Sequence, residues 1–376
     1  MTIDIALIRH SWLLVAPAAE KVTMHFYGKL FSEYPHIREL FPPAMDLQRD
    51  RLLRALTQVV LGLEDGEALG GYLGALARDH RKYGVRPEHY PAVGQCLLAA
   101  MRANAGGAWL PAYDEAWATA YRYIAEVMIQ AAEEDAAHAP PLWTGTVVSH
   151  EVRTSDIVVI GVEPDRPYPF RAGQYATLQS AHWPRVWRPY SIANAPRHDN
   201  RLSFHVRAVP GGWVSTALMR HTRVGDSLLL GPPRGSLVLD RARTPHLVFL
   251  AGGTGLAPLK ALVEESAWMP ERPSIDLFHG VRHSGDAYDV QDLRRLRAQH
   301  KRLRIIQAVS GEPEHWPCHT AVDALEYHRV TPDGDVFVCG SEEMVRETTA
   351  RLRAMGVPAD RVHTEFSPER PSFVRS

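Results

Sequence analysis

The chain has 376 residues, of which 45% are hydrophobic and 23% are charged, a composition typical of a folded protein with two or three domains. Its 42 basic and 43 acidic residues give a formal charge of −1, so net charge does not favour a nucleic-acid backbone and we expect no nucleic-acid partner. Cys96, Cys318 and Cys339 are too few and too far apart for a disulfide framework or a zinc site.

Membrane and export signals are weak. The longest apolar stretch, near 247–259, is too short to span a bilayer. A short apolar run at 11–19 resembles a signal-peptide core, but Asp4 stands where such peptides carry positive charge. We therefore expect a cytoplasmic protein with an uncleaved N-terminus and no transmembrane segment, while the sequence leaves lipid contact open.

The first ~135 residues carry apolar residues at helical spacing only. Ile5, Ile8, Trp12 and Val15 form the first such stripe, and Pro17 ends that helix. Similar stripes begin at Leu52, Leu69 and Trp117. The segment 131–141 is rich in alanine and acid and ends in two prolines, so it is expected to be a linker.

Short β-rich runs separated by proline and glycine follow the linker, at 157–162, 175–178, 203–206 and 228–230. This spacing predicts an antiparallel barrel or sandwich.

From residue 246 onward, strand-like and helical segments alternate. The strands are expected at 246–250, 275–278, 303–306 and 336–338, and a helix is expected at 341–355. Alternation of this kind predicts a parallel α/β sheet. The fold is therefore expected to be multidomain, with an all-α domain at 1–137, an antiparallel β-barrel at 138–240 and an α/β parallel-sheet domain at 241–376.

The most specific motif is Arg188-Pro189-Tyr190-Ser191, which follows a predicted barrel strand. A flavin needs an aromatic plane, a hydroxyl near N5 and a cation on its phosphate, and arginine offers a fork of donors that fits a phosphate. Strand alternation would place Arg188 and Tyr190 on one side. Taken alone, the motif also fits an ordinary strand.

A glycine pair opens a predicted helix at Gly211-Gly212-Trp213-Val214-Ser215. Free backbone N–H groups at the start of that helix, together with Ser215, could receive a pyrophosphate. An ordinary glycine turn with a helix cap is the alternative.

A second glycine loop, at 251–258, joins the first α/β strand to a helix and contains Gly253, Thr254, Gly255 and Pro258. Glycines at this point allow a dinucleotide phosphate to approach the helix N-terminus. Cys339-Gly340 ends a later strand, at the edge where open α/β sheets bind ligands, although Cys339 alone is more often a small buried hydrophobe.

Together these motifs resemble the ferredoxin-NADP reductase family, in order and spacing, over about 143–376. The resemblance implies an FAD-binding barrel and a pyridine-nucleotide domain that pass hydride to flavin and then single electrons onward. It also implies flavin contacts for Tyr175 and for Glu365-Phe366. The chain continues through 368–373, which leaves open which aromatic residue shields the flavin.

The helical segment resembles the globin domain of bacterial flavohemoglobins. The matching stretches are His25-Phe26-Tyr27, Glu39-Leu40-Phe41, His80 with 87–90, and 116–121. Since a globin joined to a flavin reductase is characteristic of that family, the resemblance extends over nearly the whole chain. It implies heme b, FAD and NADH or NADPH as cofactors.

On the distal side of the heme, the resemblance implies that Tyr27 hydrogen-bonds dioxygen, that Gln48 and Leu52 line the same pocket, and that Phe41 packs on the heme face. Gln48 and Leu52 are one helical turn apart. Taken by themselves, Gln48 is more often a solvated residue and Phe41 a core residue.

On the proximal side, the resemblance implies that His80 is the iron ligand and that Tyr90 and Glu134 hydrogen-bond it to make it a stronger donor. A lone histidine on an apolar helix face is more often a core residue, and Glu133 is an alternative to Glu134. The family usually has a lysine before the proximal histidine, which links the globin towards a C-terminal glutamate of the reductase. This chain has Asp79 there, and if Glu365 is that glutamate, the two carboxylates would repel each other. The loop between Phe41 and Gln48 is also short.

The implied activity is the conversion of nitric oxide and dioxygen to nitrate, with electrons passing from NAD(P)H through FAD to heme. A heme–flavin reductase with a different donor or acceptor is the alternative within the enzymes, and a gas sensor or oxygen-binding protein is the alternative outside them. Arg282 and Ser284 follow the second α/β strand, where a 2′-phosphate would be recognised. An arginine at this place also occurs in enzymes that use NADH, and both residues also fit an ordinary surface position. We expect NADH as the donor.

Overall fold

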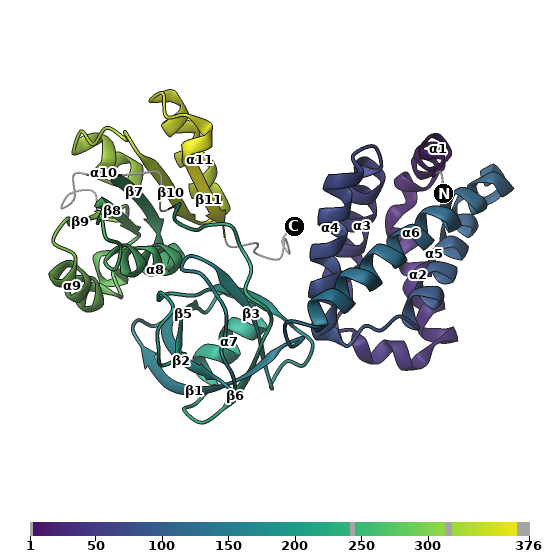
Figure 1. Ribbon diagram of the computed structural model, residues 1–376, viewed down its shortest axis with the longest axis horizontal. Coiled ribbons are helices and arrows are strands. Elements are labelled where there is room, and N and C mark those ends of the chain that lie inside the picture. The colour runs from purple at the N-terminus through teal and green to yellow at the C-terminus, as the bar shows by residue number, and fades with distance from the viewer. Residues whose placement is uncertain (1–2, 241–244, 313–317, 367–376) are drawn as a thin grey trace. The chain divides into compact units, whose positions relative to one another are not determined.

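The computed structural model describes residues 3–240, 245–312 and 318–366. The chain divides into two compact units, Met1–Leu142 and Trp143–Ser376. Each unit is described by itself below, and Figure 1 shows the elements of both.

The first unit is all-helical in its described residues, which confirms the predicted fold class. Its helices are α1 (Ile5–Val15), α2 (Ala19–Glu33), α3 (Asp46–Gly62), α4 (Gly66–His80), α5 (His89–Ala105) and α6 (Pro111–Ala136). Two short 3₁₀ turns, Pro35–Leu40 and Arg81–Tyr83, follow α2 and α4. The expected linker begins later than predicted: α6 continues through Ala136, because the alanines and glutamates of 131–136 are good helix formers.

Two interactions fix the packing of α6. Trp117 is buried and donates its indole N–H to Ser11 Oγ at 2.8 Å. Tyr121 lies against Gly94 of α5, where a Cβ atom would come within 2.5 Å of the tyrosine ring, and its hydroxyl donates to the Tyr90 carbonyl at 2.8 Å. Gly94 therefore allows α5 to approach α6, and Tyr121 holds the start of α5.

The second unit begins with an antiparallel six-stranded sheet. Its strands are β1 (Trp143–Val152), β2 (Ile157–Pro164), β3 (Tyr175–Ser180), β4 (Arg188–Ser191), β5 (Leu202–Arg207) and β6 (Ser227–Leu230), in the order β4-β3-β6-β1-β2-β5. A bridge between Ile192 and Phe204 brings the two ends together, so the sheet is a nearly closed barrel, as predicted. The helix α7 (Trp213–Arg220) lies between β5 and β6.

A parallel five-stranded sheet completes this unit and confirms the predicted α/β domain. Its strands are β7 (His246–Gly252), β8 (Ser274–Val281), β9 (Leu303–Val309), β10 (Asp335–Gly340) and β11 (Val362–Phe366), in the order β11-β10-β7-β8-β9. Its helices are α8 (Leu256–Ser266), α9 (Val290–Gln299), α10 (Ala321–Tyr327) and α11 (Glu342–Ala354). Strand order reverses between β7 and β10, and open α/β sheets bind ligands at such a switch point.

Among the described residues, no helix has the length and apolarity needed to cross a bilayer.

Gly94 and Gly71 offer a matched test of the helical packing. Gly94→Ala places a methyl group into the Tyr121 ring and should destabilise the unit by about 1–3 kcal/mol. Gly71→Ala, in α4, meets no atom within 4 Å and should stabilise the helix by up to ~1 kcal/mol. Thermal unfolding followed by far-ultraviolet circular dichroism checks both, and equal shifts for the two variants would contradict the packing described.

Candidate functional site

His80 is the last residue of α4, and its ring is fixed by its own helix. The Nδ1 atom lies 2.7 Å from the Leu76 carbonyl oxygen. Because a carbonyl can only accept, Nδ1 carries the proton, and desolvation lowers the pKa of the imidazole so that the ring is neutral at neutral pH. The Nε2 lone pair is therefore free to bind a metal, which is the tautomer that a histidine ligand to heme iron requires.

Of the two predicted proximal partners of His80, Tyr90 packs against a core cluster and Glu134 is exposed. Tyr90 lies in the first turn of α5 and packs beside the core of α4 and α6. Glu134 is exposed and accepts from Gln130 at 2.9 Å, one turn earlier on α6. Glu133 is exposed as well. Within the described part of the chain, no hydrogen bond joins Tyr90 or Glu134 to His80, whose Nδ1 is held by Leu76 instead.

Charged residues flanking His80 are paired locally. Asp79, which replaces the family's lysine, is 2.6 Å from Lys82, and the Lys82 side chain is almost fully buried. Arg81 pairs with Asp135 of α6 and donates to the Ala139 carbonyl at 2.7 Å. Asp79 is thus neutralised within its own turn, and the segment after His80 is tied to the end of α6.

The predicted distal residues lie together. Tyr27 is buried in α2, and its hydroxyl donates to the Gln48 carbonyl over a long 3.4 Å bond. Burial raises the pKa of the Tyr27 phenol, so it remains a donor. The Phe41 ring meets the Tyr27 ring edge-on at 5.6 Å between centroids, and Leu52 packs against the same core cluster.

These residues fit a heme. A heme macrocycle already supplies four nitrogens to its iron, so the protein needs to add one axial ligand, and the described residues hold no group of three or more His, Cys, Asp or Glu that would bind a bare metal ion. His80 would supply that ligand, and Tyr27 would supply a hydrogen-bond donor with a weak present partner.

Tyr175 and Glu365 meet at a glycine in the second unit. A Cβ atom on Gly235 would lie 3.2 Å from the Tyr175 ring and 3.3 Å from Glu365 Oε1, and Gly235 has a φ of +102°. Only glycine readily takes this conformation. Gly235, which the sequence analysis did not single out, therefore allows the two predicted flavin contacts to share one place.

The Arg188–Ser191 motif forms β4. Its register pairs Ala176 with Tyr190 and Leu178 with Arg188. Strand alternation therefore places Arg188 and Tyr190 on one face, and Pro189 and Ser191 on the other. Burial raises the pKa of the Tyr190 phenol, and Arg188 donates to the Trp187 carbonyl at 2.9 Å.

The glycine pair before α7 forms the expected turn. Gly211 has a φ of +73°, and no side chain caps the helix. Ser215 Oγ donates to the Gly212 carbonyl at 3.1 Å and accepts from the Val209 N–H at 3.3 Å, while Val214 is buried in the core. The helix start keeps free backbone donors for an anion, but Ser215 is already bonded to its own loop.

The second glycine loop lies at the switch point of the parallel sheet. A Cβ atom on Gly255 would come within 2.3 Å of the Cys339 carbonyl oxygen, and one on Gly252 within 3.6 Å of Gly340 Cα. Gly253 has a φ of +52°, Thr254 completes the 3₁₀ turn, and Pro258 is buried in α8. The loop and the end of β10 are therefore in close backbone contact at the switch point of the sheet, where a dinucleotide phosphate is expected.

The C-terminal prediction is placed only in part. Glu365 and Phe366 pair in register with Cys339 and Gly340. Burial raises the pKa of the Cys339 thiol, so this thiol at the end of β10 is unreactive. The Phe366 side chain and the segment 368–373 lie outside the described residues, so which aromatic residue shields a flavin stays a prediction.

A buried polar seam, missed from the sequence, joins the barrel to the parallel sheet. Lys260 of α8 lies 2.7 Å from Asp289 and 3.3 Å from Asp292, and Arg153 of the barrel lies 3.2 Å from Asp292. His205 Nδ1 is 2.7 Å from the Tyr288 hydroxyl. No local motif predicts these contacts, because they join segments that are far apart in the sequence.

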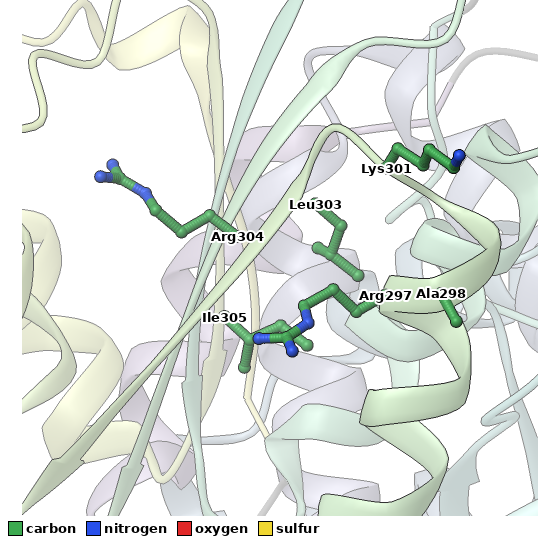
Figure 2. A pocket seen from close by; sticks show the side chains of 6 residues that line it. All are labelled: Arg297, Ala298, Lys301, Leu303, Arg304 and Ile305. Carbon is green, nitrogen blue, oxygen red and sulfur yellow. The ribbon is translucent and has the colours of Figure 1, made fainter.

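A cavity of about 490 Å³ between α9 and β9 holds none of the predicted site residues. Figure 2 shows that Arg304 and Lys301, two of its cations, point to opposite sides. Arg304 is already paired with Asp276 at 2.5 Å. Cations that diverge along an edge strand protect it from pairing with other chains, and they do not form an anion site.

Glu365 predicts a pH dependence of stability. Burial raises the pKa of this carboxyl from 4.5 to about 7. The folded state therefore binds the Glu365 proton more tightly than the unfolded state does. This proton binding adds to the free energy of unfolding in full below pH ~4.5, and the contribution is lost as pH rises through ~7. Glu365→Gln should flatten the fall in thermal midpoint of the apoprotein above pH ~6, whereas the exposed Glu343→Gln should not. A full fall in Glu365→Gln would contradict this assignment.

Comparison with known proteins agrees with the geometry. The family models for globin, for the FAD-binding domain of oxidoreductases and for the NAD-binding domain of oxidoreductases match residues 24–128, 141–238 and 249–350. The three together imply heme, FAD and a nicotinamide nucleotide as cofactors.

Whole-length relatives share this domain order. Flavohemoproteins from Rhodopirellula baltica and Pseudomonas putida are 30% and 31% identical, each over 96% of both chains. The crystal structure of a flavohemoglobin from Malassezia yamatoensis has a TM-score of 0.80 over 98% of this chain and 99% of its own, at 19% identity, which shows the same fold. The chain therefore belongs to the flavohemoprotein family, with a helical globin, an FAD-binding barrel and an NAD-binding parallel sheet in that order.

Proposed function

We propose that this oxidoreductase takes electrons from NADH, passes them through FAD to heme b, and converts nitric oxide and dioxygen to nitrate. The observation that carries the proposal is the His80 tautomer, with Nδ1 bound to Leu76 and Nε2 free, in the same helical unit as a buried tyrosine donor. FAD converts hydride to single electrons, and heme supplies the dioxygen chemistry.

In the second unit, the chain's residues bind and orient two cofactors. The loop of Gly253, Thr254 and Gly255 would hold the nucleotide pyrophosphate, with Cys339 and Gly340 as the facing wall. Tyr175, β4 and Glu365 would surround the flavin. Glu365, with its carboxyl pKa near 7, can hold or release a proton at physiological pH.

In the helical unit, His80 would hold the heme iron through Nε2, and Tyr27 would offer a hydrogen-bond donor for dioxygen. Within the described ranges, the Tyr27 hydroxyl has only the long bond to the Gln48 carbonyl to give up, so redirecting it costs little. A donor placed before the reaction stabilises charge that develops during it. We keep Tyr90 and Glu134 as candidates for tuning His80, although the structure holds His80 through Leu76.

The second candidate is a heme–flavin reductase with another electron acceptor. It is favoured by Asp79 in place of the family's lysine, and by a relative named as the ferredoxin–NAD(P)(+) reductase component of a naphthalene 1,2-dioxygenase system from Pseudomonas putida, 32% identical over 64% of this chain. The pairing of Asp79 with Lys82 weakens the first argument. A gas sensor would need neither the glycine loop before α8 nor the residues of the flavin site.

Nitrate formation tests the function. The protein with NADH should consume nitric oxide in air and yield nitrate, and Tyr27→Phe should slow this by roughly ten- to a hundredfold, because a hydrogen bond to a charged group contributes about 1.5–3 kcal/mol. The measurement is nitric-oxide electrode decay with nitrate analysis.

Tyr34→Phe is the matched control, since Tyr34 makes an exposed bond to Gln95 and should leave the rate unchanged. An unchanged rate in Tyr27→Phe would remove the tyrosine from the mechanism. NADH oxidation without nitric-oxide consumption would favour the second candidate.

We further propose NADH over NADPH. Ser284 follows β8, where the adenosine ribose is recognised, and its N–H and hydroxyl both donate to Glu312 Oε1, at 2.8 and 3.0 Å. A carboxylate there suits a ribose 2′-hydroxyl and repels a 2′-phosphate.

Glu312→Gln should therefore lower the preference for NADH, measured as the ratio of kcat/KM for NADH and NADPH, by roughly tenfold, the effect of removing ~1.4 kcal/mol of repulsion. The exposed Glu347→Gln serves as control. A ratio that stays constant in Glu312→Gln would place the ribose elsewhere.

A further inference from the structure

A buried histidine lies beside the glycine loop before α8, and the function described so far gives it no role. His279 belongs to β8 and is 3% exposed. Its side chain follows those of Ile275 and Leu277 in the alternation that faces the core. A hydrophobic residue would continue this stripe. A histidine at this position needs a polar partner, because an unpaired buried polar group costs free energy.

That partner is the loop itself. In the register of the parallel sheet, His279 lies beside Ala251 of β7, two residues before Gly253. The His279 Nε2 atom is 3.0 Å from the Gly253 carbonyl oxygen. Since a carbonyl only accepts, Nε2 carries the proton. Desolvation lowers the pKa of His279 to about 4 against the opposing effect of this bond, so the ring is neutral and Nε2–H is its one donor.

The peptide between Gly253 and Thr254 needs an anchor of this kind. Gly253 has a φ of +52° and no Cβ atom, so little steric hindrance opposes rotation of the peptide that follows it. The turn supplies one bond to the Gly253 oxygen, from the Leu256 N–H, but that N–H is shared with the Thr254 oxygen. His279 supplies a second bond to the same oxygen, from a rigid strand of the sheet.

The barrel also contacts this glycine. A Cβ atom on Gly253 would lie 3.1 Å from Nη1 of Arg207, at the end of β5. The Arg207 charge is close enough to help lower the pKa of His279, which favours the neutral ring. Side chains from both sheets therefore hold the loop at this one residue.

The bond to His279 sets the direction of the next N–H group. In a planar trans peptide, the C=O and N–H groups point to opposite sides. With the Gly253 oxygen held by His279, the Thr254 N–H points away from the histidine. N–H groups at the start of a helix have no partner within it and suit an anion. A rotated peptide would present its carbonyl oxygen instead and would repel a phosphate.

We propose that His279 is a positioning residue for the nicotinamide nucleotide: its Nε2–H holds the Gly253 carbonyl and keeps the Thr254 N–H turned toward the pyrophosphate. His279 acts through the loop without contacting the nucleotide, so it changes nucleotide affinity and leaves the rate of hydride transfer unchanged. The inference rests on the proposed function, in which this loop binds the nucleotide.

Two substitutions of similar length separate the hydrogen-bond donor from the bulk of the side chain. His279→Gln keeps an N–H donor, and His279→Met has none. The full-length protein with bound FAD and heme is titrated with NAD⁺ and with ADP-ribose by calorimetry. His279→Met should raise both Kd values by roughly three- to tenfold, the effect of one lost hydrogen bond. His279→Gln should stay within about twofold of the native protein.

Flavin reduction gives a readout that a general loss of stability would not produce. In stopped-flow mixing with NADH, His279→Met should raise the NADH concentration for half-maximal rate by the same factor and leave the limiting rate unchanged. His246→Met is the control, because His246 begins β7 at the opposite end of the sheet and should leave NAD⁺ affinity unchanged. If His279→Met does not fold, His279→Phe keeps a ring without a donor and takes its place.

Equal Kd values for His279→Gln and the variant without a donor, whether both are native-like or both are raised, would overturn the positioning role. A lower limiting rate at unchanged Kd would also overturn it. Native protein that binds neither NAD⁺ nor ADP-ribose would instead overturn the proposed function itself, so the two failures can be told apart.

Discussion

The hydrogen bond from His80 Nδ1 to the Leu76 carbonyl is the interaction on which the chemistry of the helical unit depends. It assigns the proton to one ring nitrogen and leaves the other as a lone pair, and desolvation lowers the pKa of the ring so that this state prevails at neutral pH. A histidine with the opposite tautomer, or a protonated one, could not ligate iron through Nε2. The surrounding helices need only keep the ring desolvated and place a donor, Tyr27, in the same helical unit.

The second unit relies on backbone more than on side chains. At Gly173 a Cβ atom would come within 1.9 Å of the Leu237 carbonyl oxygen, and at Gly255 within 2.3 Å of the Cys339 carbonyl oxygen. At both positions two segments of the chain come so close that no Cβ atom fits between them. Gly255 thereby allows the loop before α8 to lie against the end of β10, at the switch point where open α/β sheets bind ligands.

Local patterns predicted most of the architecture, because helix and strand periodicities are set by neighbouring residues. The glycine motifs were also predictable, since their sequence signature is the turn itself. The strands β1 and β11 were not predicted: β1 mixes glycine, threonine and histidine with its apolar residues, and β11 is a five-residue strand with a mixed sequence. Their pairing with distant partners, rather than their local pattern, makes them strands.

The sequence predicts the site residues that belong to a local motif. It does not predict those whose position depends on contacts with distant parts of the chain. Glu134 follows the family pattern in sequence, yet it lies exposed and bonded to Gln130. From the sequence, Asp79 is expected to be a repulsive charge, whereas in the structure it forms an ion pair with Lys82. The roles of Gly235 and of the buried seam around Lys260 depend on neighbours far along the chain.

The buried seam has a specific physical value. Hydride transfer requires reacting atoms about 3–3.5 Å apart, so the barrel and the parallel sheet must keep a fixed relation. Lys260, Asp289, Asp292 and Arg153 lose much of their mutual attraction to desolvation, and burial raises the pKa of the Asp289 carboxyl to about 6 even beside two cations. A net gain in the free energy of unfolding therefore does not explain why these four charged residues are buried together. Ion pairs are directional, however, and a shifted interface would leave each charge buried and unpaired, so the seam acts by penalising every arrangement except the one observed.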